Sequence, residues 1–366
     1  MKNWSLRFGA AIFIVGLMLG CMKTPETALD KTYPTKPAVI PADLAAHEWA
    51  QTEWWYYTGH LKDDAGKDYG FELTFFRARM DKEKKPLSPA FTVVGYMGHF
   101  ALVDEKTGEY KHWAIGAPEG KNAGAAFDKY DVRLYKWKAE GDEKEHHIEA
   151  EVKDYAIALD LTANKPVVAH NDNGIVAKGG GVANYYLSFT RLAVEGKLTI
   201  DGREVPVTGQ AWFDHEFGYM GMTPVTGWDW YSIQLEDNTE LMIYAIRREG
   251  GDITPESKAC RIDANSVEEC IPYSEVVIDV LGRFASPHTD GVYPSGWRIR
   301  IDAWNVDLVM VPTVADQEFY RGGMAYWEGS CKLVGSPAPG KGYVELVGYA
   351  PRPGPHGKAD NKKDGK

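Results

Sequence analysis

Short runs in which apolar and polar residues alternate recur along the chain, and they constrain its fold more than any other feature. In Tyr69–Arg79, the side chains of Phe71, Leu73 and Phe75 fall on one face, and those of Glu72 and Thr74 fall on the other. A period of two predicts a β-strand, because successive side chains of a strand point to opposite faces. The same pattern occurs at Phe91–Val103, Tyr185–Val194, Glu240–Arg247, Trp297–Val311, Met324–Val334 and Gly342–Tyr349.

Aromatic residues are abundant, with 12 Trp, 20 Tyr and 13 Phe among 366 residues, and they favour strands. Asp201-Gly202, between Lys197–Ile200 and Val205–Val207, predicts a hairpin, because a type I′ turn needs positive φ at both central residues. Helical periodicity is scarce, and only Ala42–Trp49 suggests one short helix. The sequence therefore predicts an all-β protein with antiparallel sheets arranged as sandwiches or barrels.

The N-terminus predicts export. Lys2 and Arg7 precede the apolar run Phe8–Leu19, which is shorter than the ~20 residues of a membrane-spanning helix. Gly20-Cys21 is the pattern that a lipoprotein signal peptidase recognises, with Cys21 as the lipidation site. The alternative is an ordinary secretory signal that happens to precede a cysteine. We expect a periplasmic protein that is lipid-anchored to a membrane, the outer membrane in particular.

The chain divides into five expected parts. Residues 1–20 form the signal peptide, and the Pro-rich residues 21–41 form a tether. Residues 42–220 and 221–352 form two β domains that meet near the Gly- and Met-rich stretch Gly218–Gly227. Residues 353–366 form a disordered tail.

The net charge limits the classes of partner that the protein can bind, and the cysteine spacing limits its disulfides. A net charge of −11 without a basic run predicts that the protein does not bind nucleic acid. Cys260 and Cys270 are close enough to form a disulfide in an oxidising compartment, although a bridge from Cys331 to either remains open. We expect no metal site, and His146-His147 is interpreted as a solvated turn.

The segment Gln210–Gly218 contains the strongest candidate for chemistry. In a strand, Trp212, Asp214 and Glu216 share one face, and His215 points to the other unless the strand ends or bulges there. Repulsion between two carboxylates and their burial against aromatic rings both raise a pKa, which can keep a carboxyl group protonated as an acid. The alternative is that Asp214 and Glu216 cap a strand end and pair with arginines.

Three other segments combine aromatic residues with a carboxylate: Glu53–His60, Trp228–Trp230 and Tyr326–Glu328. In the first, Glu53, Trp55 and Tyr57 lie on the face opposite Trp54, Tyr56 and His60. Each segment alone fits ordinary core packing. A buried carboxylate without a partner is costly, however. Four such segments therefore favour a shared aromatic cavity with polar points.

These motifs resemble the carotenoid 1,2-hydratase-like family, also called hydroxyneurosporene synthase-like. The resemblance is carried, in order, by Glu53–Leu61, Phe71–Arg77, His99–Ala101, Asp214–Glu216, Trp228–Trp230, Tyr326–Gly329 and Gly342–Tyr349. It implies two lipocalin-like β domains packed together, with a ligand between or within them. It also implies acid-catalysed hydration of the terminal double bond of an acyclic carotenoid or of a prenyl group. The essential Asp of the family matches Asp214, whereas Trp212 stands where the family has Tyr.

Two functions of different class are compatible with these features. In the first, Asp214 protonates an isolated double bond of an apolar terpenoid or prenylated substrate, Glu216 raises its pKa, and His215 assists; no cofactor is needed. The residues expected to line the ligand site are Glu53, Trp55, Tyr57, His99, Tyr186, Trp212, Trp228, Trp230, Tyr326 and Glu328. In the second, the protein is a non-catalytic lipocalin-like carrier that passes an apolar ligand to or from a membrane transporter of the ABC type.

Overall fold

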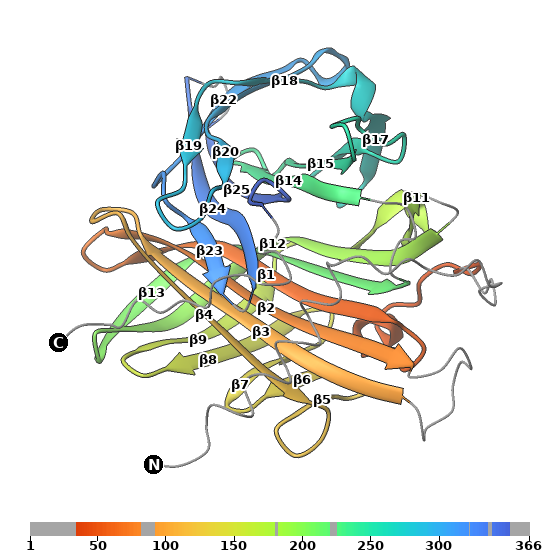
Figure 1. The fold of residues 1–366 in the computed structure, drawn as a ribbon, viewed down its shortest axis with the longest axis vertical. Coiled ribbons are helices and arrows are strands. Elements are labelled where there is room, and N and C mark those ends of the chain that lie inside the picture. Colours follow the sequence, from red (N-terminus) through yellow and green to blue (C-terminus); the bar gives the residue numbers. More distant parts are fainter. Residues whose placement is uncertain are drawn as a thin grey trace.

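The computed structural model describes residues 34–81, 92–179, 182–219, 225–321, 323–335 and 339–351. Two curled antiparallel sheets make up almost all of it (Figure 1). The predicted all-β class is therefore confirmed. Cys21, most of the expected tether, the expected tail and the expected domain boundary at 220/221 lie outside the described residues.

The first sheet contains 13 strands in the order β4-β3-β2-β1-β13-β12-β9-β8-β7-β6-β5, with β10 and β11 paired to β12. Its strands are β1 (Thr52–Asp63), β2 (Asp68–Asp81), β3 (Thr92–Asp104), β4 (Glu109–Pro118), β5 (Ala123–Ala125), β6 (Tyr130–Leu134), β7 (Trp137–Gly141), β8 (Glu145–Val152), β9 (Tyr155–Ala163), β10 (Val168–Ala169), β11 (Ile175–Gly179), β12 (Val182–Ile200) and β13 (Arg203–Gly218).

The second sheet contains 10 strands in the order β17-β16-β15-β14-β25-β24-β22-β21-β18, with β23 paired to β24, and β19 and β20 form a separate pair. Its strands, with that pair, are β14 (Val225–Leu235), β15 (Glu240–Arg248), β16 (Lys258–Ile262), β17 (Glu268–Pro272), β18 (Val277–Val280), β19 (Arg283–Ala285), β20 (Val292–Pro294), β21 (Trp297–Ile301), β22 (Val306–Pro312), β23 (Glu318–Arg321), β24 (Met324–Val334) and β25 (Gly340–Val347).

In the part of the chain that the structure describes, helical structure is limited to four single 3-10 turns. These are η1 (Ala42–Leu44), η2 (His170–Asp172), η3 (Tyr273–Glu275) and η4 (Asp302–Trp304). Within the described ranges, no helix has the length and apolar character needed to cross a membrane.

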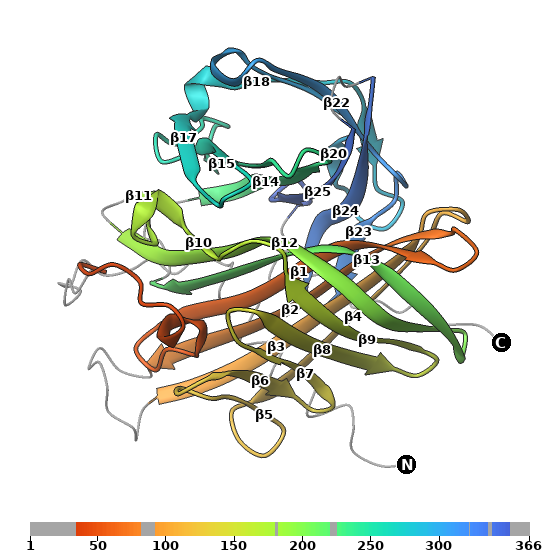
Figure 2. The same ribbon diagram turned by 180° about the vertical axis from the view of Figure 1, so that it is seen from behind.

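The second sheet packs over one face of the first, as two opposite views show (Figures 1 and 2). Each sheet encloses its own apolar core. A third buried cluster lies where the sheets meet and draws side chains from both. Its members are Tyr56, Val168, Val176, Tyr186 and Trp212 from the first domain, and Trp230, Met242, Tyr244, Ile246, Cys260, Ile262 and Tyr343 from the second. We call this third cluster the interdomain cluster.

A long hairpin, β12–β13, carries the centre of the first sheet. Asp201 and Gly202 turn it with φ of 51° and 75°, so the structure has the positive values that a type I′ turn needs. Pairing between β12 and β13 is interrupted by a bulge between Phe189 and Leu192. Both of these residues belong to the first core. The two residues between them, Thr190 and Arg191, point away from the first core and hydrogen bond to Glu240 on β15 of the other domain.

Three local expectations are corrected. The expected helix over 42–49 is only the turn η1, because the backbone N–H of His47 donates to the Glu53 carboxylate at 3.0 Å instead of continuing a helix. The expected strand Trp297–Val311 is two strands, because η4 and Asn305, with φ of 52°, reverse the chain. His146 is buried in β8 and hydrogen bonds to the Tyr57 hydroxyl, so His146-His147 is not a solvated turn.

Candidate functional site

Three adjacent strands place a row of polar side chains against the second domain. Asp214 on β13 lies directly opposite Tyr56 on β1 and Ser188 on β12. Residues that are opposite one another in neighbouring strands share a face, and this face meets the interdomain cluster. As alternation predicted, Trp212, Asp214 and Glu216 lie on this face, whereas Phe213 and Phe217 lie in the first core.

Asp214 is 2% exposed and accepts three hydrogen bonds. The Tyr186 hydroxyl donates to Oδ2 at 2.6 Å, and Ser188 Oγ and Trp212 Nε1 donate to Oδ1 at 2.5 and 2.6 Å. Burial raises the pKa of Asp214 to about 6, although these donors and the nearby His170 act in the opposite direction. About half of this carboxyl group is therefore protonated at pH 6 and about a tenth at pH 7, a far larger fraction than for a free Asp.

Glu216 has a different role from the one expected. Its carboxylate pairs with Lys178 Nζ at 2.7 Å and accepts a hydrogen bond from Asn184 at 2.8 Å. The lysine balances its charge, so burial and not repulsion from Glu216 accounts for the raised pKa of Asp214. The alternative that these carboxylates pair with arginines is also not what the structure shows.

Aromatic rings from both domains pack around Asp214. Trp230 of β14 meets Trp212 and Tyr56 edge to face, with ring centroids 5.9 and 5.4 Å apart. Trp228 and Trp54 are only partly buried and pack against the same cluster. A cavity of about 10 Å³ lies beside Trp212, between Thr58 and Tyr343, about the size that holds one water molecule. The expected aromatic wall is present, but its rings touch one another.

A second group of carboxyl groups extends this contact toward β24 and β25. Glu328 accepts a 2.5 Å hydrogen bond from the Tyr56 hydroxyl, and Glu345 accepts one from Trp228 Nε1 at 2.7 Å. Burial raises the pKa of Glu345 to about 7 and that of Glu328 well above its usual range, and in both cases nearby carboxylates add to the increase. Glu72 of β2 behaves in the same way, with a pKa raised to about 8 by burial. The contact thus contains several protonated acids.

His99 and Tyr326 belong to the same side of this contact. The His99 Nδ1 and Tyr326 hydroxyl oxygen are 2.7 Å apart, and Phe319 stacks on the imidazole with centroids separated by 4.2 Å. Burial lowers the pKa of His99 to about 3, so the ring is neutral. These two predicted residues lie beside Glu72 and Glu328 and not beside Asp214.

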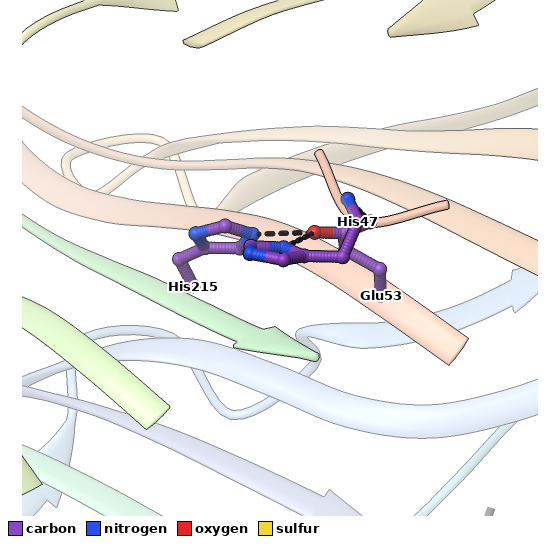
Figure 3. A group of neighbouring side chains, drawn as sticks. All are labelled: His47, Glu53 and His215. Atoms are coloured by element: carbon purple, nitrogen blue, oxygen red, sulfur yellow. Dashed lines mark hydrogen bonds and ion pairs between the residues drawn. The ribbon is translucent and has the colours of Figure 1, made fainter. Parts of the chain in front are cut away.

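Four predicted residues point away from the site. Glu53, Trp55, Tyr57 and His215 face the first core, because each is separated by an odd number of positions from the site-facing residue of its own strand. Figure 3 shows the imidazoles of His47 and His215 directed at one oxygen of Glu53, each 2.9 Å away.

The His47–Glu53–His215 cluster has the composition of a metal site, and its ligand atoms lie within 4.8 Å of one another. The negative charge of the Glu53 carboxylate is already compensated, however. The Arg77 guanidinium lies 3.8 Å from its Oε2, and the His47 backbone N–H donates a hydrogen bond to it. Burial alone would raise the pKa of Glu53, but hydrogen bonds from His215 and His47 lower it. The cluster is a satisfied polar network that fixes residues 43–53 to the first domain.

Sequence reasoning missed two residues that contact the Asp214 site through Ser188. His170 Nε2 lies 2.7 Å from Ser188 Oγ, and His170 Nδ1 lies 2.5 Å from Glu268 Oε1. Glu268 comes from β17, 98 positions away from His170, so no local spacing could reveal the pair. Beside it, Cys260 and Cys270 form a disulfide between β16 and β17, and Cys331 is free and buried.

Comparisons with known proteins agree with this architecture. The AttH-like family model matches residues 31–349. The solved structure of a protein described as AttH, from Nitrosomonas europaea, is 30% identical with a TM-score of 0.78, and the match covers 88% of this chain and 100% of that one. A sequence comparison with curated proteins gives no match.

Two more distant structures share the fold. Kievitone hydratase from Nectria haematococca is 15% identical with a TM-score of 0.66, covering 88% of this chain and 95% of that one. CghA, solved with Sch210972, is 14% identical with a TM-score of 0.50, covering 87% and 96%. The two curled sheets are thus the lipocalin-like arrangement that the sequence resemblance implied.

Proposed function

This protein belongs to the AttH-like family, and we propose that it adds water to an isolated carbon–carbon double bond of an apolar terpenoid or prenylated substrate. The fold that it shares with kievitone hydratase supports hydration chemistry. The observation that carries the proposal is Asp214, a buried acid whose pKa is raised to about 6, held among aromatic rings at the contact between two domains.

Each group around Asp214 suits one step of such a reaction. The neutral carboxyl group donates its proton to the less substituted alkene carbon, which leaves a tertiary carbocation. The faces of Trp212, Trp230 and Tyr56 can stabilise this cation, at about 0.5–2 kcal/mol for each contact. A water oxygen then bonds to the cationic carbon and the added water loses one proton, so no proton is consumed overall.

The aromatic rings that line the site favour an apolar substrate. Because Trp230 packs directly on Trp212 and Tyr56, binding must separate these rings. Trp54 and Trp228 are partly exposed at the edge of the interdomain cluster, and they would contact an entering prenyl chain first. Lys178, a cation near these rings, is paired with Glu216 at 2.7 Å, so its charge is balanced.

We place this reaction in the periplasm, with the protein anchored through a lipid on Cys21. The Gly20-Cys21 junction supports the anchor, and the Cys260–Cys270 disulfide supports an oxidising compartment. An anchored protein would meet an apolar substrate that the membrane delivers.

Asp214→Asn tests the proposal, because the amide keeps the shape of the side chain and cannot donate an acidic proton. With a prenylated phenol and an acyclic carotene as separate probes, we expect the variant to lose hydration at least about 100-fold, with ligand binding and thermal unfolding unchanged. Asp160→Asn, an exposed change on the same sheet, is the control.

Activity should also fall as pH rises through the pKa of Asp214, near 6, since only the protonated form is the acid. If the wild type binds both probes but hydrates neither, the carrier function is correct instead. If Asp214→Asn unfolds the protein, the carboxyl group is structural.

A further inference from the structure

A chain of hydrogen bonds leads from Asp214 across the contact between the domains. Ser188 Oγ lies 2.5 Å from Asp214 Oδ1 and 2.7 Å from His170 Nε2, and His170 Nδ1 lies 2.5 Å from Glu268. We infer that Asp214 and His170 share one proton through Ser188, and that Glu268 of the second domain orients His170 for this transfer. The inference rests on the proposed function for its catalytic meaning.

The chain has two states that differ only in the direction of its hydrogen bonds. When Asp214 is neutral, it donates to Ser188 Oγ, and the Ser188 hydroxyl donates to the unprotonated Nε2 of His170. When Asp214 is ionised, protonated His170 donates from Nε2 to Ser188, which donates to the carboxylate. A serine hydroxyl can donate and accept at once, so one proton passes between the two groups without a change in contacts.

Ser188 is the suitable partner of Asp214 for this exchange. Trp212 Nε1 can only donate, so it cannot accept a proton from the carboxyl group. Burial raises the pKa of Tyr186 well above its usual range, so its hydroxyl keeps its proton. Ser188 alone of the three has a base directly behind it.

Glu268 fixes which nitrogen of His170 faces Ser188. Its carboxylate contacts Nδ1 and also accepts the backbone N–H of Asn171 at 2.7 Å. Burial acts to raise the pKa of Glu268, but the charge and hydrogen bond of His170 lower it, so it stays ionised. An ionised carboxylate at Nδ1 keeps a proton on that nitrogen and leaves Nε2 for Ser188.

The lysines around this chain of hydrogen bonds have partners of their own. Lys178 pairs with Glu216 beside Tyr186, and Lys258 hydrogen bonds to Asn171 next to Glu268. Burial raises the pKa of Glu345, on β25, to about 7, and the charges of Asp214 and Glu216 add to the increase. His170 is therefore the group at the far end of the chain whose ring nitrogen can either accept or donate a proton.

The chain gives Asp214 a route for recovering its proton. After Asp214 protonates the alkene, Asp214 is ionised and His170 is neutral, and His170 then takes up a proton from solvent at β17, the edge strand of the second sheet. A proton next moves from His170 Nε2 to Ser188 Oγ while the Ser188 proton moves to Asp214 Oδ1, which restores neutral Asp214 and an unprotonated Nε2. The added water loses one proton to solvent and His170 gains one from solvent, so the cycle neither consumes nor releases protons overall.

Ser188, His170 and Glu268 also have the connectivity of a hydrolase triad, but Ser188 is poorly placed as a nucleophile. It is fully buried, and its Oγ contacts the Asp214 carboxylate. A carboxylate at that position would repel the oxyanion that acyl transfer forms, where a nucleophilic serine needs hydrogen-bond donors. The geometry favours a proton carrier.

The first experiment does not depend on turnover. In protein labelled with ¹⁵N-histidine, we expect the pH dependence of the His170 ring signals to change in both Asp214→Asn and Ser188→Ala, because each variant disconnects the shared proton. Identical His170 signals at every pH in the wild type and both variants would overturn the inference.

The second experiment connects the chain to catalysis. We expect Glu268→Gln to lower kcat about 10-fold or more with KM unchanged, and we expect added imidazole to restore activity to His170→Ala. Glu269→Gln, an exposed neighbour on the same strand, is the control and should match the wild type.

The possible failures are distinguishable. A wild type that hydrates neither probe but shows coupled His170 signals refutes the proposed function and leaves the shared proton in place. An active wild type whose His170 and Glu268 variants retain full rates refutes the shared proton and leaves the function in place. Covalent labelling of Ser188 by a fluorophosphonate would show that it is a nucleophile and would overturn the proton-carrier role.

Discussion

The Tyr56 hydroxyl, on the first sheet, donates a 2.5 Å hydrogen bond to Glu328 on the second. Both residues are buried, so this hydrogen bond links the two domains in a region that is shielded from solvent. Tyr56→Phe should lower the free energy of unfolding by about 1–3 kcal/mol, since it leaves a buried acceptor unpaired.

A double-mutant cycle with Glu328→Gln, measured by denaturant unfolding, should return a coupling energy of about 1 kcal/mol. Tyr155→Phe is the control, because it removes an exposed 2.6 Å bond to Asp201, and it should change stability little. A coupling energy near zero would mean that Tyr56 and Glu328 do not hold the domains together.

The buried acid Glu72 predicts that stability depends on pH. Its pKa is raised from 4.5 to about 8, so the folded protein binds more protons than the unfolded chain between those values. The contribution of Glu72 to stability is therefore lost as pH rises from about 4.5 through 8. Glu72→Gln, which mimics the neutral acid, should match the wild type at pH 5 and exceed its stability at pH 8. Equal stability of the two proteins at both pH values in urea unfolding would contradict the raised pKa.

Lipidation of Cys21 is tested by Cys21→Ser. Because the thiol is the site of lipid attachment, the variant should not incorporate radioactive fatty acid and should separate from the membrane fraction. Cys331→Ser, which changes a buried free thiol, should incorporate the label as the wild type does. Equal labelling of both variants would show that Cys21 is not the anchor.

The disulfide predicts a specific peptide map. Proteolysis without reduction should yield one peptide pair joined through Cys260 and Cys270, and Cys331 should react with a thiol reagent only after denaturation, since it is buried. Detection of Cys331 in a disulfide would contradict the structure at this point.

The period-two pattern was sufficient to predict long strands such as β2, β3, β12, β15, β24 and β25 and the face that Asp214 occupies, but it did not find β4 to β11. It worked because one face of each strand is buried in a core, which leaves a strong local signal. It failed at Trp297–Val311, where both halves of a hairpin continue the alternation and the turn at Asp302–Trp304 has no glycine or proline. It also overlooked the hydrogen bonds between His47 and Glu53 that replace a helix.

The site could be predicted only in part, because its contacts are long-range. Trp212 and Asp214 were found from the alternation of one strand, and Asp214 also from a family resemblance. His215 lies on the opposite face of β13 from Asp214, as the alternation predicted, and Glu53 lies beside it in the first core, so neither residue contacts Asp214. The partnership of Ser188, His170 and Glu268 depends on how two domains meet, and no spacing within the chain encodes that.

The bulge at Thr190 and Arg191 determines the parity of the strand. Before it, odd-numbered residues such as Leu187 and Phe189 face the first core; after it, even-numbered residues such as Leu192 do so. Phe189 pairs with Phe213 and Leu192 pairs with Ala211, and all four lie in the first core. Deleting one bulge residue would therefore restore simple alternation and leave Tyr186 and Ser188 facing the second domain. The bulge thus supplies one extra side chain at the contact between the domains, where Thr190 and Arg191 both reach Glu240, and a deletion here would weaken that contact while the face of Asp214 stays as it is.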